Sequence, residues 1–381
     1  MSLSVVVAPG PFKGALAASD AARAIGAGVR LTAQGATTHL APIADGGEGT
    51  MDALVAASSG IQKFATVLDP LGRPVRAGFG LLPGSIAVVE LAQASGYERV
   101  SPTELDPEEA STFGTGELIR AALDHEPQTV IVGVGGSATT DGGLGLARAL
   151  GVRLLDVEGE ELEGRGRDLS RIVAIDTSQL DPRIATTEIL VACDVDTPLH
   201  GEHGAARVFG PQKGAAPDAV ERLDAGLAAL ERLFAEQCGV ELGGVPRAGA
   251  AGGAAGGMAA MLGARLEPGA HLVLDAVGLD DLLAGADLCV TGEGSLDHQT
   301  LSGKGPAAVA KRARSAGVPC VALCGALRLG PGQVRDADFA AAFAVGRGIR
   351  TLEEALVQTE RDLAAAGASI GGLLAALSAS G

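Results

Sequence analysis

Short apolar runs that end in glycine-rich segments recur along the chain, and alanine-rich stretches follow several of them. Continuous apolar strands alternating with helices are typical of a parallel sheet covered on both faces. The predicted fold class is therefore α/β, with a doubly wound, mainly parallel sheet. The expected strands are residues 4–8, 129–134, 286–291, 319–324 and 340–345, and helices are expected over about 18–33, 142–150 and 305–316.

The length of the chain and two breaks in this rhythm predict a second domain. At 381 residues, the chain exceeds the size at which a single core usually stops growing. Residues 62–98 contain strand-like segments joined by turns without a helix, and 151–210 again contain strand-like segments. We therefore expect a mixed α/β domain inserted into the doubly wound one. The boundaries expected are 1–60, 108–150 and 266–381 for the doubly wound domain, and 61–107 and 151–265 for the inserted domain.

Charge and composition exclude several classes of partner. The net charge is −17 and aromatic residues make up only 2%, whereas a nucleic-acid binder needs a basic surface and usually stacking aromatics. No apolar span reaches the length that crosses a bilayer. The five cysteines form no Cys-x-x-Cys pair, which fits reduced, buried thiols. We expect a cytoplasmic protein that binds neither nucleic acid nor membrane.

Glycine is unusually frequent, with 57 residues among 381, roughly twice the average share. The tract 248–260 consists almost entirely of glycine and alanine. Its alanine content and the apolar residues that follow favour a tight loop opening a closely packed helix over a flexible linker.

Acidic residues lie among glycines at three places, in 45–49, 135–143 and 291–297. Each segment follows an apolar run, and ligands of doubly wound sheets bind beyond the carboxyl ends of the strands. Glycine permits close approach of the backbone to a ligand because it has no Cβ. These segments predict an active site that handles phosphate and a divalent metal.

The segment Gly133–Ala138 has two readings. It matches the G-x-G-x-x-A dinucleotide fingerprint, and Asp156 stands at about the spacing where the ribose-binding acid is expected. Hydroxyls and backbone amides before a helix also suit phosphate oxygens, and we favour this phosphate cradle. An NAD-dependent oxidoreductase and a non-catalytic binding protein for a small organic acid remain the alternatives. The cradle residues are Gly135, Gly136, Ser137 and Thr139.

Phosphoryl transfer in this chain must use a design of its own, because neither a P-loop motif nor the protein-kinase His-Arg-Asp motif occurs. The chemistry still requires carboxylates for the metal, cations for the transferring group and a carboxylate that orients the attacking hydroxyl. The candidate carboxylates are Asp45, Glu48, Asp141, Asp194, Glu293 and Asp297, and the candidate cations are Lys13, Lys213 and Lys304.

With these residues laid out, the whole chain resembles the bacterial class I glycerate kinases. The motifs occur in the order found in that family. They are Ala8-Pro-Gly-Pro-Phe-Lys-Gly14, Ala44-Asp-Gly-Gly-Glu-Gly-Thr50, Phe113-Gly-Thr-Gly-Glu-Leu-Ile119, Gly135-Gly-Ser-Ala-Thr-Thr-Asp-Gly-Gly143, Asp194–Leu199, Val208-Phe-Gly-Pro-Gln-Lys-Gly214 and Thr291-Gly-Glu-Gly-Ser-Leu-Asp297.

The resemblance implies two α/β domains with the site in the cleft between them, and transfer of the γ-phosphoryl group of ATP to D-glycerate with Mg²⁺. We expect the 2-hydroxyl to be the acceptor and the protein to be a monomer or a homodimer. Gly10 and Pro11 replace the Asp-Ser that the family usually carries, so substrate selection or rate could differ. The roles expected are catalytic for Asp45, Asp194 and Lys13; substrate-binding for Lys213, Glu48 and Arg73; nucleotide-binding for Gly135, Gly136, Ser137, Thr139, Glu293 and Lys304; and metal-binding for Asp297 and Asp141.

Overall fold

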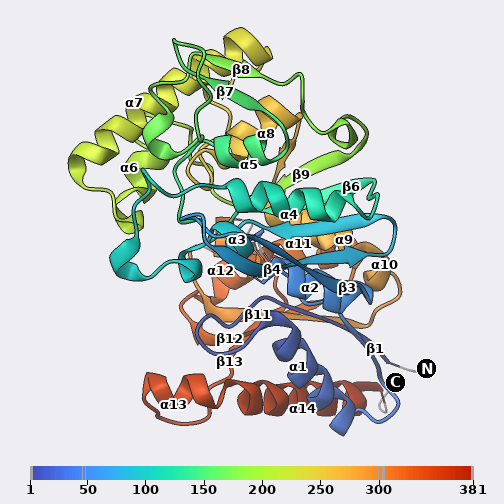
Figure 1. Ribbon diagram of the computed structural model, residues 1–381. Helices are drawn as coiled ribbons and strands as arrows, with labels where there is room; N and C mark the ends of the chain where they lie inside the picture. Colours follow the sequence, from blue (N-terminus) through green and yellow to red (C-terminus); the bar gives the residue numbers. More distant parts are fainter. Residues whose placement is uncertain (1–2, 45, 48, 299, 303–304, 379–381) are drawn as a thin grey trace. The chain divides into compact units, whose positions relative to one another are not determined.

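The computed structural model describes residues 3–44, 46–47, 49–298, 300–302 and 305–378. It divides into two compact units (Figure 1). Unit 1 comprises residues 1–45, 52–59 and 270–381, and unit 2 comprises 46–51 and 60–269. The prediction that put 108–150 in the doubly wound domain is wrong. The strand in that segment pairs with strands of unit 2 on both sides, and an isolated apolar run does not reveal its partners.

Unit 1 contains a five-stranded parallel sheet in the order β13-β12-β11-β1-β2. The chain places β2 on one side of β1, and β11, β12 and β13 on the other. The strand order therefore reverses between β1 and β11, which is where doubly wound sheets bind ligands. The strands are β1 (Ser4–Pro9), β2 (Thr37–Leu40), β11 (Leu288–Leu296), β12 (Cys320–Leu327) and β13 (Ala341–Ala344).

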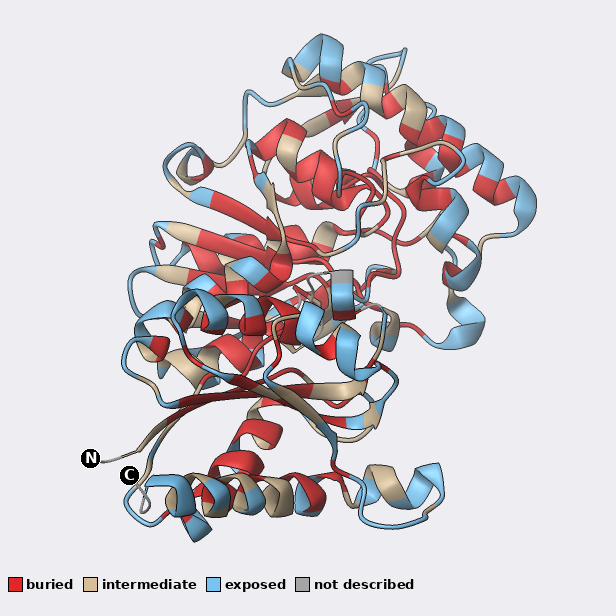
Figure 2. Ribbon diagram, turned by 180° about the vertical axis from the view of Figure 1, so that it is seen from behind, coloured by how far each residue is buried: buried red, intermediate tan, exposed pale blue. Residues whose placement is uncertain are grey.

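The helices of unit 1 are α1 (Ala18–Thr32), α2 (Thr50–Ser58, which starts in unit 2), α9 (Gly269–Ala276, whose first residue belongs to unit 2), α10 (Leu279–Leu283), α11 (Pro306–Ser315), α12 (Pro331–Asp336), α13 (Leu352–Val357) and α14 (Thr359–Ser378). Helices α1 and α14 lie side by side against one face of the sheet (Figure 1). In Figure 2, α14 at the bottom alternates between buried and exposed residues.

Helices α1 and α14 approach closely because glycines lie at their crossing. A Cβ on Gly28 would come within 2.0 Å of the Ala364 carbonyl oxygen, and one on Gly367 within 2.3 Å of the Ile25 carbonyl oxygen. Real Cβ atoms do not tolerate such distances. The high glycine content of the chain is thus explained in part by helix packing, in addition to turns.

Unit 2 contains a six-stranded mixed sheet in the order β10-β9-β6-β5-β4-β3, and a separate antiparallel pair, β7-β8. Strands β5, β6, β9 and β10 are parallel, and β4 and β3 continue the sheet as an antiparallel edge. The strands are β3 (Ile61–Leu68), β4 (Pro74–Leu82), β5 (Ile86–Glu90), β6 (Thr129–Gly133), β7 (Arg153–Leu155), β8 (Ala174–Asp176), β9 (Glu188–Ala192) and β10 (Arg265–Glu267).

An aliphatic core fills unit 2 between this sheet and its helices. The glycine- and alanine-rich tract forms a loop followed by α8, as expected, and nearly every residue of α8 is buried. The helices are α3 (Ala92–Ser95), α4 (Phe113–Leu123), α5 (Leu144–Ala149), α6 (Ala205–Phe209), α7 (Pro217–Leu233) and α8 (Ala254–Leu262).

Candidate functional site

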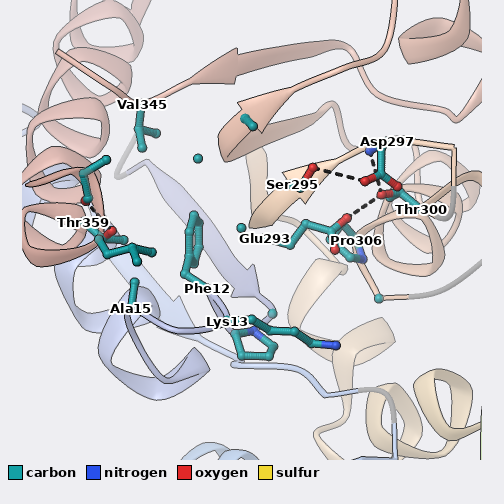
Figure 3. A pocket seen from close by; sticks show the side chains of 18 of the residues that line it. Phe12, Lys13, Ala15, Glu293, Ser295, Asp297, Thr300, Pro306, Val345 and Thr359 are labelled. Carbon is teal, nitrogen blue, oxygen red and sulfur yellow. Dashed lines mark hydrogen bonds between the residues drawn. The ribbon is translucent and has the colours of Figure 1, made fainter. Parts of the chain in front are cut away.

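A pocket of about 560 Å³ lies at the carboxyl ends of the strands in unit 1 (Figure 3). Residues at or just beyond the end of every strand of the sheet contribute to its wall. It therefore includes the point between β1 and β11 where the strand order reverses. Such pockets are the usual ligand sites of open α/β sheets, and this volume falls within the range of small-molecule sites.

The two ends of this pocket differ in chemistry. Mostly apolar side chains from the β1–α1 turn, from the end of β13 and from α13 line one end, and mostly polar and charged groups line the other. In Figure 3, Phe12 and Val345 lie toward the first end, while Lys13 extends toward the second. The apolar lining of the first end includes Phe12, Ala15, Val345, Leu352, Ala355 and Leu356, and the polar lining of the second includes Lys13, Glu293, Ser295, Asp297 and Thr300. Thr359 and Asp362 of α14 also line the pocket.

The polar end is built on the last residues of β11. The Thr300 hydroxyl donates to the Glu293 carboxylate at 2.6 Å, and the Ser295 hydroxyl donates to Asp297 at 3.1 Å (Figure 3). The backbone amide of Asp297 donates to the Thr300 hydroxyl oxygen at 3.2 Å. These bonds orient two carboxylates in one small region of the pocket wall.

The expectation of a glycine loop over residues 291–297 is wrong, because β11 continues through Leu296. Glu293 and Ser295 pair with Cys324 and Ala326 of β12. Gly292 is needed inside the strand, since a Cβ there would lie 1.9 Å from the Leu323 carbonyl oxygen. Glycine in this segment serves close strand packing, although its frequency suggested a turn.

The second glycine segment, 135–143, lies in unit 2 and is largely buried. Asp141 is fully buried and accepts hydrogen bonds from the Thr112 amide and hydroxyl, both at 2.7 Å, and from the amides of Gly143 and Gly145. Burial raises the pKa of this carboxyl against the lowering effect of these bonds. Both carboxylate oxygens thus accept hydrogen bonds from groups of the protein itself. We propose this positioning role for Asp141 in place of the metal ligation predicted from the sequence.

Lys213 is buried against the same segment. Its Nζ donates to the Ser137 hydroxyl at 3.1 Å and to the Thr139 carbonyl oxygen. Burial lowers the pKa of this ammonium to about 7, and the charge of Asp141 opposes that shift. The side chain therefore fixes the loop from inside unit 2. This geometry supports a positioning role more than the direct substrate contact predicted for it.

The dinucleotide reading of Gly133–Ala138 finds no support in the geometry. Asp156, its proposed ribose ligand, accepts from the amides of Glu158 and Glu160 and so caps its own turn. The strand directly before Asp156 is β7, which belongs to the separate two-stranded sheet. The helix after the cradle, α5, is short and almost entirely buried.

Acidic side chains also lie at the carboxyl ends of the parallel strands of unit 2. The buried Glu90 ends β5 and accepts from the Met51 amide at 2.7 Å. Asp194 follows β9 and accepts from the Gly269 amide at 2.9 Å. Gly46 lies so close to β9 that a Cβ would come within 2.6 Å of the Ala192 carbonyl oxygen. Gly46 and Met51 therefore both contact the carboxyl end of this sheet.

Arg73 lies near the β3–β4 turn and already has acidic partners. Its guanidinium contacts Asp69 at 2.6 Å and Glu104 at 3.1 Å, and these side-chain hydrogen bonds raise its pKa. Asp45, Glu48 and Lys304 lie outside the described residues. Their predicted roles, and that predicted for Arg73, remain predictions.

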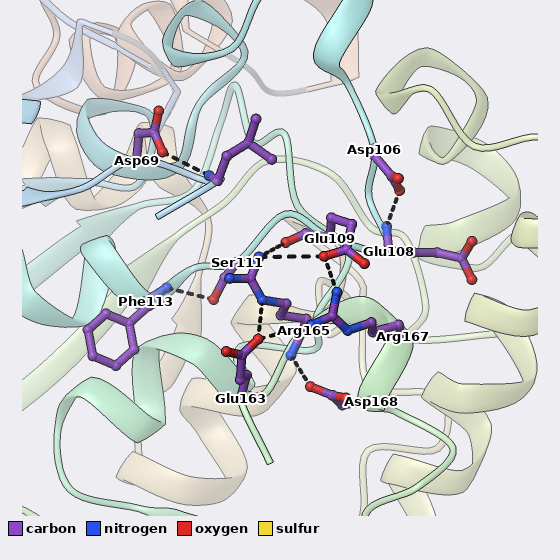
Figure 4. A network of polar contacts seen from close by, with 11 residues as sticks. Asp69, Asp106, Glu108, Glu109, Ser111, Phe113, Glu163, Arg165, Arg167 and Asp168 are labelled. Carbon is purple, nitrogen blue, oxygen red and sulfur yellow. Dashed lines mark hydrogen bonds and ion pairs between the residues drawn. The ribbon is translucent and has the colours of Figure 1, made fainter. Parts of the chain in front are cut away.

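A network of ion pairs holds the segment before α4 (Figure 4). This segment carries Thr112, whose hydroxyl donates to Asp141. Arg165 and Arg167 both contact Glu109 and Glu163, with a Glu163–Arg165 distance of 2.7 Å. A single exposed ion pair contributes little to stability. Ion pairs that share partners restrict the motion of one another's side chains. These ion pairs hold residues 106–113 against residues 163–168.

Sequence reasoning missed Glu90, Phe12 and the apolar wall from α13. Phe12 lies within a quoted motif, but its size drew no attention beside Lys13. Glu90 ends an apolar strand, a position that could have marked it. No local signal identifies α13 as a pocket wall, because only the fold brings it beside β1.

Among the residues described, no three or more His, Cys, Asp or Glu side chains are grouped so that they could hold a metal ion by themselves. The part of the chain that the structure describes also has no helix long and apolar enough to cross a membrane.

Comparison with known proteins gives one answer. The model of the glycerate kinase family matches residues 5–375. The chain belongs to this family. A glycerate kinase of Halalkalibacterium halodurans is 45% identical over 93% of this chain and 94% of its own length. The glycerate 2-kinase of Escherichia coli K12 is 41% identical over 93% of each chain.

A solved structure agrees with the family assignment. A Salmonella typhimurium LT2 protein, provisionally called glycerate kinase 2, superimposes with a TM-score of 0.90 at 40% identity, covering 99% of each chain. The α/β fold and the expected membership of a phosphotransferase family are thus confirmed.

Proposed function

We propose that this enzyme transfers the γ-phosphoryl group of ATP to the 2-hydroxyl of D-glycerate, and that the pocket of unit 1 holds the nucleotide. The single observation that carries the second part is the division of this pocket into an apolar and a charged end. Membership of the glycerate kinase family and similarity to a glycerate 2-kinase support the first part.

The size and polarity of the pocket fit a nucleotide better than glycerate. Glycerate is small and polar throughout, so an apolar wall would contribute nothing to its binding. A nucleoside triphosphate has a flat, largely apolar base at one end and anionic phosphates at the other. The base would lie between Phe12 and the α13 side chains Leu352 and Leu356, with the phosphates toward Lys13.

The polar end suits a magnesium ion bound together with phosphates. Mg²⁺ prefers oxygen ligands and usually takes one or two carboxylates, with phosphate oxygens and waters completing its shell. Glu293 and Asp297 offer carboxylates on one stretch of wall, oriented by Thr300 and Ser295. They would hold the ion, which would neutralise charge on the phosphates. Lys13 would stabilise the transferring group.

We assign the acceptor side to two carboxylates, Asp45 and Asp194, which follow β2 and β9 in the sequence. Asp45 directly follows Ala44, a residue of the pocket wall. We assign Asp45 to orienting the 2-hydroxyl and accepting its proton, with Asp194 as the second catalytic carboxylate. Glu48 would contact the substrate. We place this activity in the cytoplasm, which the free cysteines support.

A coupled ADP-release assay with D-glycerate, ATP and Mg²⁺ tests this function, and ³¹P NMR of the product identifies the phosphorylated hydroxyl. We expect 2-phosphoglycerate, and no ADP when EDTA replaces Mg²⁺. ADP release without D-glycerate dependence would reject the acceptor. A 3-phosphorylated product would reject the position, and reduction of NAD by D-glycerate without ADP would reject the kinase.

A further inference from the structure

The connection between β13 and α14, which includes α13, forms part of the apolar end of the pocket. We propose that an ion pair between Arg350 and Asp362 positions this wall and thereby sets the affinity for the nucleotide, without taking part in phosphoryl transfer. This inference rests on the proposed function, because it concerns the ligand assigned to the same pocket.

The ion pair joins a connecting segment to a long helix. Arg350 lies between β13 and α13, and Asp362 lies in the first turn of α14 and itself lines the pocket. The guanidinium contacts the two oxygens of Asp362 at 2.5 and 3.4 Å, and it also donates to the Arg347 carbonyl oxygen at 2.7 Å. One side chain thus ties its own segment together and fixes it to α14.

Both partners are well shielded from solvent. The Arg350 side chain is 16% exposed and that of Asp362 is 4% exposed. Exposed pairs contribute little, whereas removing one partner of a buried pair leaves an uncompensated charge. The geometry of this contact therefore constrains the backbone around it.

Apart from a hydrogen bond that the Thr359 hydroxyl donates to the Ala355 carbonyl oxygen at 3.0 Å, few of the described contacts hold α13. None of its residues is buried, and Leu352 is 75% exposed although it lines the pocket. The helix has its own capping box, in which Thr351 and Glu354 bond each other's amides at 3.0 and 3.2 Å. These bonds stabilise the helix internally, but they do not place it against the pocket.

The other side of the ion pair is rigid. Helix α14 packs against α1 at the glycine crossing of Gly28 and Gly367, and Leu363 beside Asp362 is fully buried in the core of unit 1. A fixed carboxylate holds a segment that has few apolar anchors. Loss of the pair should therefore let the wall move away from the base while the polar end remains intact.

The test compares Arg350→Met, Asp362→Asn and the double variant with wild type. Equilibrium affinity for ATP is measured by calorimetry in the presence of Mg²⁺, and kcat and both KM values by ADP release. We expect ATP affinity to fall and the KM for ATP to rise by about tenfold, as for a lost buried contact. The kcat and the KM for D-glycerate should stay within about twofold.

Two further results make the assignment specific. The double variant should lose no more ATP affinity than either single variant, because both remove the same interaction. Arg312→Met is the matched control, since Arg312 is 17% exposed and pairs with Asp275 and Asp280 without lining the pocket. It should keep the ATP affinity of wild type.

Leu352→Ser tests the wall without disturbing a buried charge. It should weaken ATP binding whether or not the ion-pair variants fold, because it removes an apolar contact with the base. Unchanged ATP affinity in Leu352→Ser, or in folded Arg350→Met and Asp362→Asn, would overturn the inference. If wild type is active and the variants keep its ATP affinity, the result contradicts this inference but not the proposed function. A wild type that binds ATP but forms no phosphoglycerate contradicts the proposed function alone, and one that binds no ATP contradicts both.

Discussion

Lys213 should make the stability of the protein depend on pH in a direction opposite to that of an ordinary lysine ion pair. Burial lowers the pKa of its ammonium from 10.5 to about 7 in the folded protein. The folded state therefore loses this proton near pH 7, whereas the unfolded chain keeps it to a much higher pH. Because the unfolded state binds more protons between these values, the free energy of unfolding rises with pH across this window.

The size of the effect follows from the difference in bound protons. Between about pH 7.5 and about pH 9.5 the unfolded chain holds nearly one proton more, which corresponds to roughly 2.5 kcal/mol. Other groups titrate in the same range, so the quantity to compare is wild type minus Lys213→Met. Methionine fills a similar volume but carries no titrating group.

Urea denaturation at both pH values measures this difference, with the exposed Lys63→Met of β3 as the control variant. The stability of wild type relative to Lys213→Met should increase by about 2 to 3 kcal/mol at the higher pH. Wild type relative to Lys63→Met should show no such gain. Parallel pH dependence of wild type and Lys213→Met would refute the argument that burial lowers the pKa of Lys213.

Three other changes have definite expected outcomes. Asp45→Asn should keep the melting temperature and lower turnover on the order of 10²-fold; turnover within about threefold of wild type would remove Asp45 from the catalytic residues. Gly28→Ala should destabilise unit 1 by roughly 1 to 3 kcal/mol in chemical denaturation, because its Cβ would meet the Ala364 carbonyl oxygen. The control Gly372→Ala should be neutral or stabilising, because its Cβ would make only an ordinary contact at 3.9 Å. Arg247 has φ of +74°, so Arg247→Gly should be more stable than Arg247→Ala by about 1 kcal/mol in the same assay; equal stabilities would show that the backbone there is not strained.

Local patterns predicted the elements of this fold well, but not their partners. The runs at 4–8, 129–134 and 319–324 correspond to β1, β6 and β12, because continuous apolar residues suit strands covered on both faces. Such strands look alike in sequence. Pairing of β6 with β5 and β9 depends on contacts between residues far apart in the chain, so its domain could not be assigned from its own residues.

The site residues, too, could be predicted from the sequence only in part. Lys13, Glu293 and Asp297 were selected from motifs, and all three line one pocket. Asp141 has an equally suggestive motif, yet its carboxylate is enclosed by amides and a hydroxyl. A glycine-rich acidic segment has the same sequence signature whether its carboxylate faces a ligand or the protein interior. Burial separates the two cases, and burial depends on the whole fold.

Photoaffinity labelling with 8-azido-ATP and Mg²⁺, followed by peptide mass spectrometry, tests the location of the nucleotide most directly. The azide marks the position of the base, which the account places between the β1–α1 turn and α13. Labelling should therefore fall within residues 10–15 and 345–359 and should disappear when excess ATP competes. Protectable labelling of residues 135–143 instead would show that the base binds in unit 2 and would contradict the account.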